Sequence, residues 1–463
     1  MQIFNLIAIS IIARKLSPSD FGVVAIATIL ITFLNNLISQ GVSQFVIYDR
    51  EGSDERLNSA FWLNVLISLV IVAVGFVISP FISEFYNEPK IQLIINLLLI
   101  RVPLESVIVI IDSSFNKKLE FKILEKRDIF VQLLSISISI IMALNGFGVW
   151  SLIIPGIIVA FIRFSITLYI SKWKPKRKLD ITHWREIFSY SSKIIASSVI
   201  NFFISEGDTL IIGKIMGSYK LGIYNLAWRG SNLVSRNIVS LVNKMSFPFI
   251  ASSGSNNFEI LVKINKIFRI LSIITFPILF LFFILAEEFI LGVYGSQWYE
   301  SIIPFQILII YAIRYSVGAP IGAVYKSIGR PDINLKIGLS MIPFYILGII
   351  IGTSYGIIGV AIGVTIVRTF FGFISFFILG KILNTTVWTF FRQMRCSFIA
   401  TLITSLIIFI LKHYCIKIFT ENYLLSLFVL FGIGLLLFLI ILKFFFKDTS
   451  NEITIILKKI YYK

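Results

Sequence analysis

Long apolar stretches separated by short polar segments recur along the whole chain. Each runs for roughly 18 to 25 residues, enough for a helix rising about 1.5 Å per residue to cross a hydrocarbon core of about 30 Å. Barrel strands would be shorter and would alternate in polarity. The pattern predicts an all-α integral membrane protein with about fourteen transmembrane helices, over Gln2–Ala13, Asp20–Gln40, Ala60–Ser83, Ile91–Asp112, Ile129–Ala143, Val149–Ser171, Ile187–Met216, Leu221–Phe247, Val262–Ala286, Ser301–Tyr325, Leu335–Gly352, Gly356–Leu383, Met394–Leu411 and Tyr423–Phe446.

The second half of the chain repeats features of the first. Residues 11–14 correspond to residues 211–214, and Gly22 corresponds to Gly222, at one offset of 200 residues. An offset of 208 residues pairs three further positions: Lys118 with Lys326, Lys122 with Arg330, and Gly148 with Gly356. These offsets group the helices as six, six and two, in two pseudo-symmetric lobes (1–186 and 187–392) and a C-terminal segment with the last two helices and a tail (393–463).

Lysine and arginine are concentrated in alternate loops. One set of loops and the C-terminal tail hold 26 of the 42 basic residues, and the opposite set holds 7. Because positive residues are retained in the cytoplasm, both termini are predicted to be cytoplasmic. About a dozen apolar residues precede Arg14, fewer than the ~17 needed to cross, so either the first helix is short or the chain starts upstream. Residues 447–463 are predicted to form an interfacial helix or a solvated tail.

Composition supports the membrane assignment and narrows the function. Hydrophobic residues make up 57% of the chain and charged residues 14%, against about 25% charged residues in soluble domains. The net charge of +18 lies mainly in short loops, which indicates topology and not nucleic-acid binding. Cys396 and Cys415 have no metal-ligand spacing. No cofactor, metal site or removable signal peptide is predicted.

Ionisable residues inside the predicted spans are the main candidates for function. Each costs roughly 2.5 to 3.5 kcal/mol at a helix centre, so such residues usually line a cavity or pair with one another. The set is Arg101, Glu105, Arg163, Lys193, Glu206, Asp208, Arg229, Arg236, Arg314 and Arg368. Arg163 and Lys193 lie near the predicted inner interface, where snorkelling is the simplest interpretation.

Five arginines are predicted to form the basic wall of a cavity. Arg229 and Arg236 are two turns apart and share a helix face, while Arg314 and Arg368 fall near the middles of their spans. Arg101 is the fifth. Structural ion pairs or snorkelling are the alternatives for these residues, and Arg101 is placed to pair with Glu105 four residues away.

Glu206 and Asp208 are candidates for ion coupling. They lie near the outer end of the seventh span, beside a helix break that we expect at Gly207. A carboxylate in a low-dielectric cavity can exchange a proton near neutral pH. The alternative is that these carboxylates pair with Lys214 or Lys220 at a wet helix end.

The motifs of common enzyme classes are absent from the sequence. There is no P-loop, no H-E-x-x-H, no G-x-S-x-G and no carboxylate pair in a sizeable extramembrane loop. The chain is therefore predicted to pass a substrate across the membrane and not to be an enzyme.

Five short motifs, in order, resemble those of the polysaccharide transporter family. They are Ala13–Gly22 (ARKLSPSDFG), Leu221–Ala227 (LGIYNLA), Phe247-Pro248, Tyr294–Trp298 (YGSQW) and Ser327–Pro331 (SIGRP). That family includes Wzx-type flippases and colanic-acid-exporter-like proteins of the multidrug/oligosaccharidyl-lipid/polysaccharide (MOP) superfamily, and the resemblance implies a MATE/MOP-like fold.

The resemblance implies a function in surface polysaccharide synthesis, such as O-antigen, capsule or exopolysaccharide. The expected protein is a monomeric flippase of the bacterial inner membrane that carries undecaprenyl-pyrophosphate-linked oligosaccharide by alternating access. Its expected partners are membrane lipids, a polysaccharide polymerase and a chain-length regulator. The predicted basic wall suits a pyrophosphate, because arginine forks bind phosphate oxygens well. A multidrug antiporter, expected to have an acidic cavity, and a membrane polymerase, expected to have a large outer loop, are the alternatives.

Overall fold

The structure is a computed structural model that describes residues 2–49, 53–171, 173–176, 181–254, 256–419 and 422–445. Every regular element in this part of the chain is helical. The described chain divides into two compact units, residues 1–222 (unit 1) and 223–463 (unit 2). The predicted lobe boundary between residues 186 and 187 stays a prediction.

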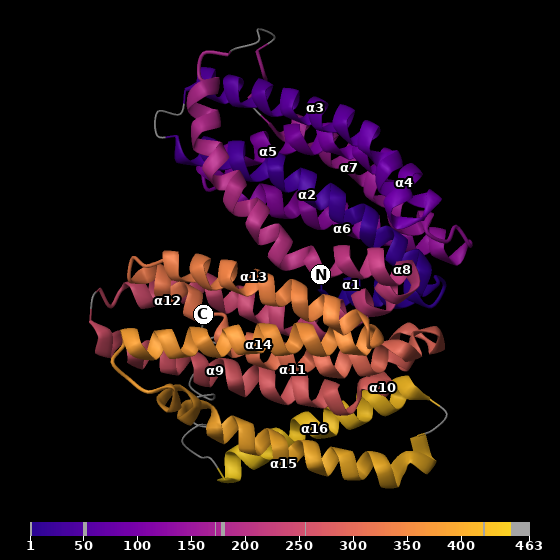
Figure 1. Ribbon diagram of the computed structural model, residues 1–463, viewed down its shortest axis with the longest axis vertical. Helices are drawn as coiled ribbons and strands as arrows, with labels where there is room; N and C mark the ends of the chain where they lie inside the picture. Colours follow the sequence, from indigo (N-terminus) through magenta and orange to yellow (C-terminus); the bar gives the residue numbers. More distant parts are fainter. Residues whose placement is uncertain are drawn as a thin grey trace. The chain divides into compact units, whose positions relative to one another are not determined.

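Unit 1 is a bundle of long helices, drawn from indigo to magenta in Figure 1. In it α2 and α5 pack together, as do α3 and α4, and α6 and α7. The helices are α1 (Gln2–Ala13), α2 (Pro18–Tyr48), α3 (Asp54–Tyr86), α4 (Pro89–Leu99), α5 (Arg101–Lys117), α6 (Phe121–Leu144), α7 (Trp150–Ile170) and the first part of α8 (Trp184–Ala251).

Unit 2 has α13 along one edge and α15 with α16 along the opposite edge (Figure 1). Between them, α14 packs on α13 and α11, and α9 packs on α11 and α15. Besides the end of α8, its elements are α9 (Asn257–Ile284), α10 (Ala286–Phe289), a π-helical turn (Ile290–Tyr294), a 3₁₀ turn (Ser296–Ser301), α11 (Ile302–Gly318), α12 (Ile321–Ser327), α13 (Asp332–Thr353), α14 (Gly356–Ile382), α15 (Val387–Phe419) and α16 (Tyr423–Phe445).

Eleven helical segments of the described chain are long and apolar enough to cross a membrane. The predicted all-helical, multi-pass class is therefore confirmed, whereas the count of fourteen stays a prediction. The first helix has the predicted bounds and is short, with twelve residues. The predicted interfacial helix over 447–463 lies outside the described residues.

Glycine and proline decide where several predicted spans are interrupted. The expected break at Gly207 is wrong, because α8 is helical there; the break falls at Gly217, whose φ of 80° is open to glycine but strained for other residues. It separates the predicted seventh and eighth spans. The fourth span divides into α4 and α5 because Pro103 has no N–H to donate to the Leu99 carbonyl. Pro320 likewise separates α11 from α12.

The two glycines that the repeat pairs with each other are in contact within unit 1. A Cβ built on Gly22 would lie 1.8 Å from the Ser218 carbonyl oxygen, and one built on Gly222 would lie 1.8 Å from the Pro18 carbonyl oxygen. The hydroxyls of Ser19 and Ser218 are 2.9 Å apart. Only glycine lets the backbones approach so closely, which explains why both copies of the motif carry it.

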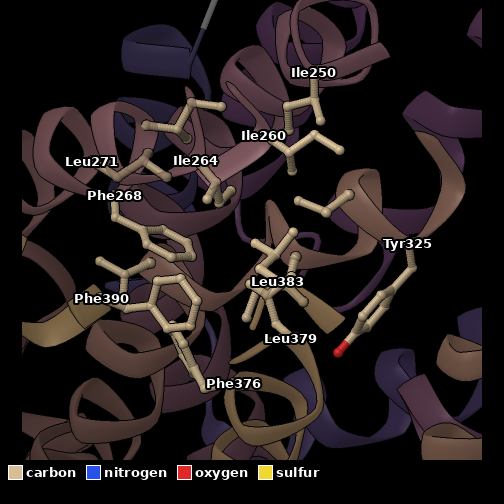
Figure 2. Close-up of a cluster of buried hydrophobic side chains, with 14 of the residues drawn as sticks. Ile250, Ile260, Ile264, Phe268, Leu271, Tyr325, Phe376, Leu379, Leu383 and Phe390 are labelled. Carbon is tan, nitrogen blue, oxygen red and sulfur yellow. The ribbon is translucent and has the colours of Figure 1, made fainter. Parts of the chain in front are cut away.

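Each unit has its own apolar core. In unit 2, shown in Figure 2, the rings of Phe268, Phe376 and Phe390 meet with centroids 5.5 to 6.2 Å apart. Leu379 and Tyr325 pack into the same cluster. A core of unit 1 is built from α2, α3, α5 and α8 around the buried residues Val42, Phe45, Val46, Ala60, Phe61, Leu63, Ile110 and Ile187. These cores fix the helix faces that carry the polar residues described next.

Candidate functional site

Three arginines of unit 2 gather around two aromatic rings. The Cζ atom of Arg236 lies 5.8 Å from the ring centroid of Trp228, and that of Arg314 lies 5.3 Å from the centroid of Tyr311. Arg368 lies near both rings, 4.9 Å from Trp228 and 5.4 Å from Tyr311. Guanidinium groups within about 6 Å of a ring centroid are attracted by its π face. We call these five residues the arginine–aromatic cluster; its arginines are three of the five predicted for the basic wall.

A stack of rings from α8 and α11 supports the cluster. Tyr224 and Trp228 are four residues apart on one face of α8, with ring planes 11° apart and centroids separated by 6.2 Å. Trp228 stacks in turn on Tyr311 of α11, at 5.5 Å and 11°. All three side chains are buried. The aromatic support is therefore rigid. Trp228 and Tyr311 were not predicted from the sequence, and Tyr224 was noted only as part of the Leu221–Ala227 motif.

Hydrogen bonds to two tyrosine hydroxyls orient Arg368 on α14. Its Nη2 donates to the Tyr345 hydroxyl oxygen at 2.6 Å, and its Nη1 donates to the Tyr311 hydroxyl oxygen at 3.4 Å. The second contact is longer than a normal N–H···O bond. The Tyr345 ring, from α13, also lies 4.6 Å from the Arg368 Cζ atom. Three helices thus position one guanidinium.

The guanidinium of Arg314 lies directly against the backbone of α14. A Cβ built on Gly372 would be only 2.3 to 2.6 Å from Nη1, Cζ and Nε of Arg314. The absence of a side chain at Gly372 makes the room that this guanidinium occupies. The Nε atom of Arg314 is buried and has no hydrogen-bond partner among the residues that the structure describes, so it keeps an unused donor.

Arg314 also lines an apolar cavity of about 470 Å³ between α9, α11, α14 and α15. The hydroxyl of Thr369 in its wall is buried and has no hydrogen-bond partner. The other lining residues are Phe276, Ile310, Ile313, Val317, Phe373, Phe376, Trp388, Phe391, Met394, Arg395 and Phe398. The cavity is therefore suited to an apolar chain that carries a polar, anionic end.

The cluster keeps positive charge that nearby carboxylates do not neutralise. In the described part of the chain, neither Arg236 nor Arg314 forms an ion pair with a carboxylate, and both lie against aromatic rings. A guanidinium has five N–H donors in a fixed fork and matches phosphate oxygens well. The arrangement can therefore bind an anion such as a phosphate or a pyrophosphate.

Arg229 lies outside this cluster. It is exposed on α8, and its positive charge acts on Tyr294 in the π-helical turn. Burial raises the pKa of the Tyr294 phenol, and the charge of Arg229 opposes that shift. The shared helix face predicted for Arg229 and Arg236 therefore does not place Arg229 among the cluster rings.

Arg101, the fifth predicted arginine, belongs to unit 1 and to a chain of ion pairs. Its Nη2 lies 3.6 Å from Glu105, which accepts a hydrogen bond from Arg163 at 3.3 Å. Arg163 also forms ion pairs with Asp112 at 3.3 Å and with Asp128 at 3.2 Å. We call these residues, together with Arg127, the ionic ladder. The predicted pairing of Arg101 with Glu105 is confirmed as an ion-pair contact.

Arg127 anchors the buried end of the ladder. Its side chain is 2% exposed, and its Nη1 and Nη2 donate to the two carboxylate oxygens of Asp112 at 2.6 and 2.8 Å. It also donates to Asp128 and to the hydroxyl of Thr167. A two-pronged contact of this kind is among the strongest polar contacts in proteins. It ties α5, α6 and α7 together.

Arg127, Asp112 and Asp128 were not predicted as site residues. Asp112 is the last residue of its predicted span and the other two lie just before the next one, although Glu105 and Asp112 are seven residues apart and hence on one face of α5. The snorkelling expected of Arg163 is wrong, because it pairs with three carboxylates. The side chain of Lys193 is outside the described residues.

Glu206 and Asp208 both lie within α8. Asp208 is buried, and its carboxylate accepts the backbone N–H of Thr209 at 2.9 Å, while Glu206 is half-buried. Lys214, one of their expected alternative partners, instead donates to the Phe85 carbonyl. Ion coupling at these carboxylates stays a prediction.

The described residues contain no group of three or more His, Cys, Asp or Glu placed to hold a metal ion.

Comparison with known proteins gives matches over most of the chain. The sequence profile of the family described as "Polysaccharide biosynthesis protein" matches residues 11–303. The lipopolysaccharide biosynthesis protein WzxC of Escherichia coli (strain K12) is 24% identical over 385 residues, 81% of this chain and 77% of that protein. The teichuronic acid biosynthesis protein TuaB of Bacillus subtilis (strain 168) is 22% identical, over 81% and 79% of the two chains.

Solved structures show that the fold is that of MOP-superfamily transporters. The lipid II flippase MurJ, in an inward closed conformation, superposes with a TM-score of 0.74 over 96% of this chain and 97% of that chain, at 18% identity. An inward-facing multidrug resistance MATE family transporter of the MOP superfamily superposes at 0.64, over 83% and 95%, at 15% identity. At these identities the likeness describes the fold alone.

Proposed function

This chain belongs to the polysaccharide biosynthesis protein family, and from that premise we propose that it is a flippase for lipid-linked oligosaccharide. It moves undecaprenyl-pyrophosphate-linked repeat units from the cytoplasmic to the periplasmic leaflet of the bacterial inner membrane, for the synthesis of a surface polysaccharide. The names of its relatives, which concern lipopolysaccharide and teichuronic acid biosynthesis, support this class of substrate.

The observation that carries the proposal is the arginine–aromatic cluster. Arg314 and Arg368 lie within helical segments apolar enough to span the membrane, where a charge without a role is costly. Rings hold Arg236 and Arg314 in place and leave their donors for an anion. The pyrophosphate is the part of the substrate that most needs such support, because its charges must pass through hydrocarbon.

The cavity beside Arg314 supports a place for the lipid part of the same substrate. Its wall is almost entirely apolar, and Arg314 belongs both to this wall and to the cluster. A pyrophosphate bound at Arg314 would therefore have an apolar space next to it for its first isoprene units.

In this proposal the protein works by alternating access of two six-helix lobes, with two further helices at the C-terminus and both termini in the cytoplasm. Arg101 and Arg229 also belong to the proposed basic wall, and Glu206 and Asp208 take part in ion coupling. The protein transports its substrate without a chemical reaction. It acts as a monomer next to a polysaccharide polymerase and a chain-length regulator.

A deletion strain tests the proposed function. We expect loss of surface polysaccharide, with single repeat units on the undecaprenyl carrier trapped on the cytoplasmic face, and recovery with the wild-type gene. Unpolymerised units on the periplasmic face would indicate a polymerase. An unchanged surface, in a strain with no second flippase, would favour a multidrug antiporter; a multidrug resistance transporter is among the solved structures of similar fold.

Two substitutions test the cluster in the same strain. We expect Arg236→Ala and Arg314→Ala each to lower export about tenfold, because each removes a charged donor to the pyrophosphate. Protein levels in the membrane, measured by immunoblot, should stay normal, since neither side chain has a carboxylate partner among the described residues that would be left unpaired. Normal export in both variants would rule out the cluster as the pyrophosphate site.

A further inference from the structure

Arg101 lies at the end of the ionic ladder opposite Arg127. It has more N–H donors than the nearby Glu105 carboxylate can accept. In the described part of the chain, Arg101 donates no hydrogen bond; its one polar contact is the 3.6 Å approach to Glu105, longer than a hydrogen bond. Its Nε atom is buried and has no partner. The guanidinium of Arg101 has five N–H groups, but only one carboxylate oxygen, Oε1 of Glu105, lies near it.

Glu105 is shared between two guanidinium groups. Its Oε1 faces Arg101 at 3.6 Å, and its Oε2 accepts from Nη1 of Arg163 at 3.3 Å. Both arginine side chains are more than a quarter exposed, at 29% and 27%, and Glu105 is 17% exposed. The site is therefore within reach of a ligand, unlike the buried Arg127 at the other end of the ladder.

The distances along the ladder indicate which pairs can open. The Arg127–Asp112 contacts are 2.6 and 2.8 Å, those of Arg163 are 3.2 to 3.3 Å, and that of Arg101 is 3.6 Å. Partly exposed ion pairs of long geometry contribute little to stability. Replacing Glu105 as the partner of Arg101 should therefore cost little free energy, whereas breaking the Arg127–Asp112 pair should cost more.

Gly156 on α7 makes room for the Arg101 guanidinium. A Cβ built on Gly156 would lie 3.0 Å from the Arg101 Nη1 atom, so the absence of a side chain there lets this guanidinium lie against α7. A phosphate group offers more charge and more acceptor oxygens than one carboxylate, so it competes well for two such guanidiniums.

We propose that Arg101 and Arg163 form a phosphate-binding site in unit 1, and that Glu105 is its resident anion, displaced when a phosphate group enters. Glu105 keeps the two arginines neutralised and oriented while the site is empty. The ligand class is a mono- or diphosphate ester, and identifying it with the substrate's pyrophosphate rests on the proposed function.

Glu105→Gln tests the proposal because the substitution should tighten phosphate binding and not weaken it. The amide keeps the shape of the side chain but cannot compete as an anion, so we expect binding to become about fivefold tighter, the equivalent of one weak ion pair. Binding is measured by microscale thermophoresis on the purified full-length chain in neutral detergent. The probes are inorganic pyrophosphate and, in mixed micelles, undecaprenyl pyrophosphate.

Glu125→Gln is the matched control. Glu125 is exposed on α6, so the substitution makes the same change in net charge away from the two arginines. We expect its affinities to stay within about twofold of wild type, as for an exposed charge screened by solvent. In the double variant Arg101→Gln/Glu105→Gln, the gain should disappear. If Glu105→Gln does not fold, Glu105→Asp, with its carboxylate drawn back from Arg101, should tighten binding by a smaller factor.

Each outcome decides the proposal. Unchanged or weaker binding in Glu105→Gln, or an equal gain in Glu125→Gln, would overturn it and leave the ladder as a purely structural network. A gain with both probes, or with the lipid alone, supports a site for the lipid-linked substrate, whereas a gain with inorganic pyrophosphate alone would overturn that identification. A wild-type protein that binds no lipid would count against the proposed function, and the inorganic probe would still test the site.

Discussion

The two units hold their intramembrane arginines in opposite ways. In unit 1 the ladder sets Arg101, Arg127 and Arg163 against three carboxylates. In unit 2 the cluster sets Arg236 and Arg314 against aromatic rings. Carboxylates cancel the charge of a guanidinium, whereas rings orient it and leave the charge in place.

This difference separates structural charge from functional charge. A buried ion pair is costly to break because the partner that remains is left as an unpaired charge. A guanidinium on a ring has no such partner, so removing it affects the anion that it would bind more than the fold. Stability should therefore depend mainly on the buried Arg127–Asp112 end of the ladder, and transport on the cluster.

The largest expected effect is on stability, in Asp112→Ala. It removes the two-pronged partner of the buried Arg127 and should lower the free energy of unfolding by about 3 kcal/mol. Arg314→Ala should cost on the order of 1 kcal/mol, since it removes packing and one cation–π contact only. Thermal unfolding in detergent, followed by far-UV circular dichroism, compares the two.

Export measured in the same two variants distinguishes a loss of transport from a loss of folded protein. Arg314→Ala should lose export at normal protein levels, and Asp112→Ala should lose it only in proportion to the folded protein. Equal losses of stability in the two variants would contradict the division between ladder and cluster.

The next effect is on transport alone, in Gly372→Ala. The new Cβ would meet the Arg314 guanidinium at 2.3 to 2.6 Å, so this flexible side chain must move while its charge is retained. We expect export to fall about fivefold, with little change in stability, because alanine favours a helix over glycine by about 1 kcal/mol. Gly432→Ala, whose Cβ meets nothing within 4 Å, is the control and should export normally. Normal export in Gly372→Ala would mean that the position of Arg314 is unimportant.

The smallest expected effects come from removing a tyrosine hydroxyl beside Arg368, first in Tyr345→Phe. It keeps the ring near Arg368 but removes the hydroxyl that accepts its 2.6 Å hydrogen bond, a contact worth about 1 to 2 kcal/mol. We expect a threefold or smaller loss of export, measured as the initial rate of polymer synthesis. Tyr311→Phe removes only the 3.4 Å contact and should have less effect. The reverse order would mean that the ring contacts, and not the hydroxyl, orient Arg368.

Part of the site could be predicted because a charge inside an apolar span is visible in any sequence. Arg236, Arg314 and Arg368 were identified in this way, and the structure places them around Trp228 and Tyr311. The rings themselves were missed, because aromatic residues are common in membrane helices and nothing in the sequence marks those that face an arginine. Arg127 and Asp112 were missed because they lie at the ends of the apolar stretches.

The sequence by itself determined the class of the protein, most helix positions and the internal repeat, because these depend on local hydrophobicity and on spacing along the chain. Which side chains meet depends on helix rotation and packing, and only the tertiary structure decided that. The repeat pairs Gly22 with Gly222 in sequence, but only the structure shows that each faces the backbone of the other motif. In the same way, the i,i+4 spacing already indicated that Arg101 could pair with Glu105, as it does, whereas only the structure shows that Arg314 lies on the ring of Tyr311.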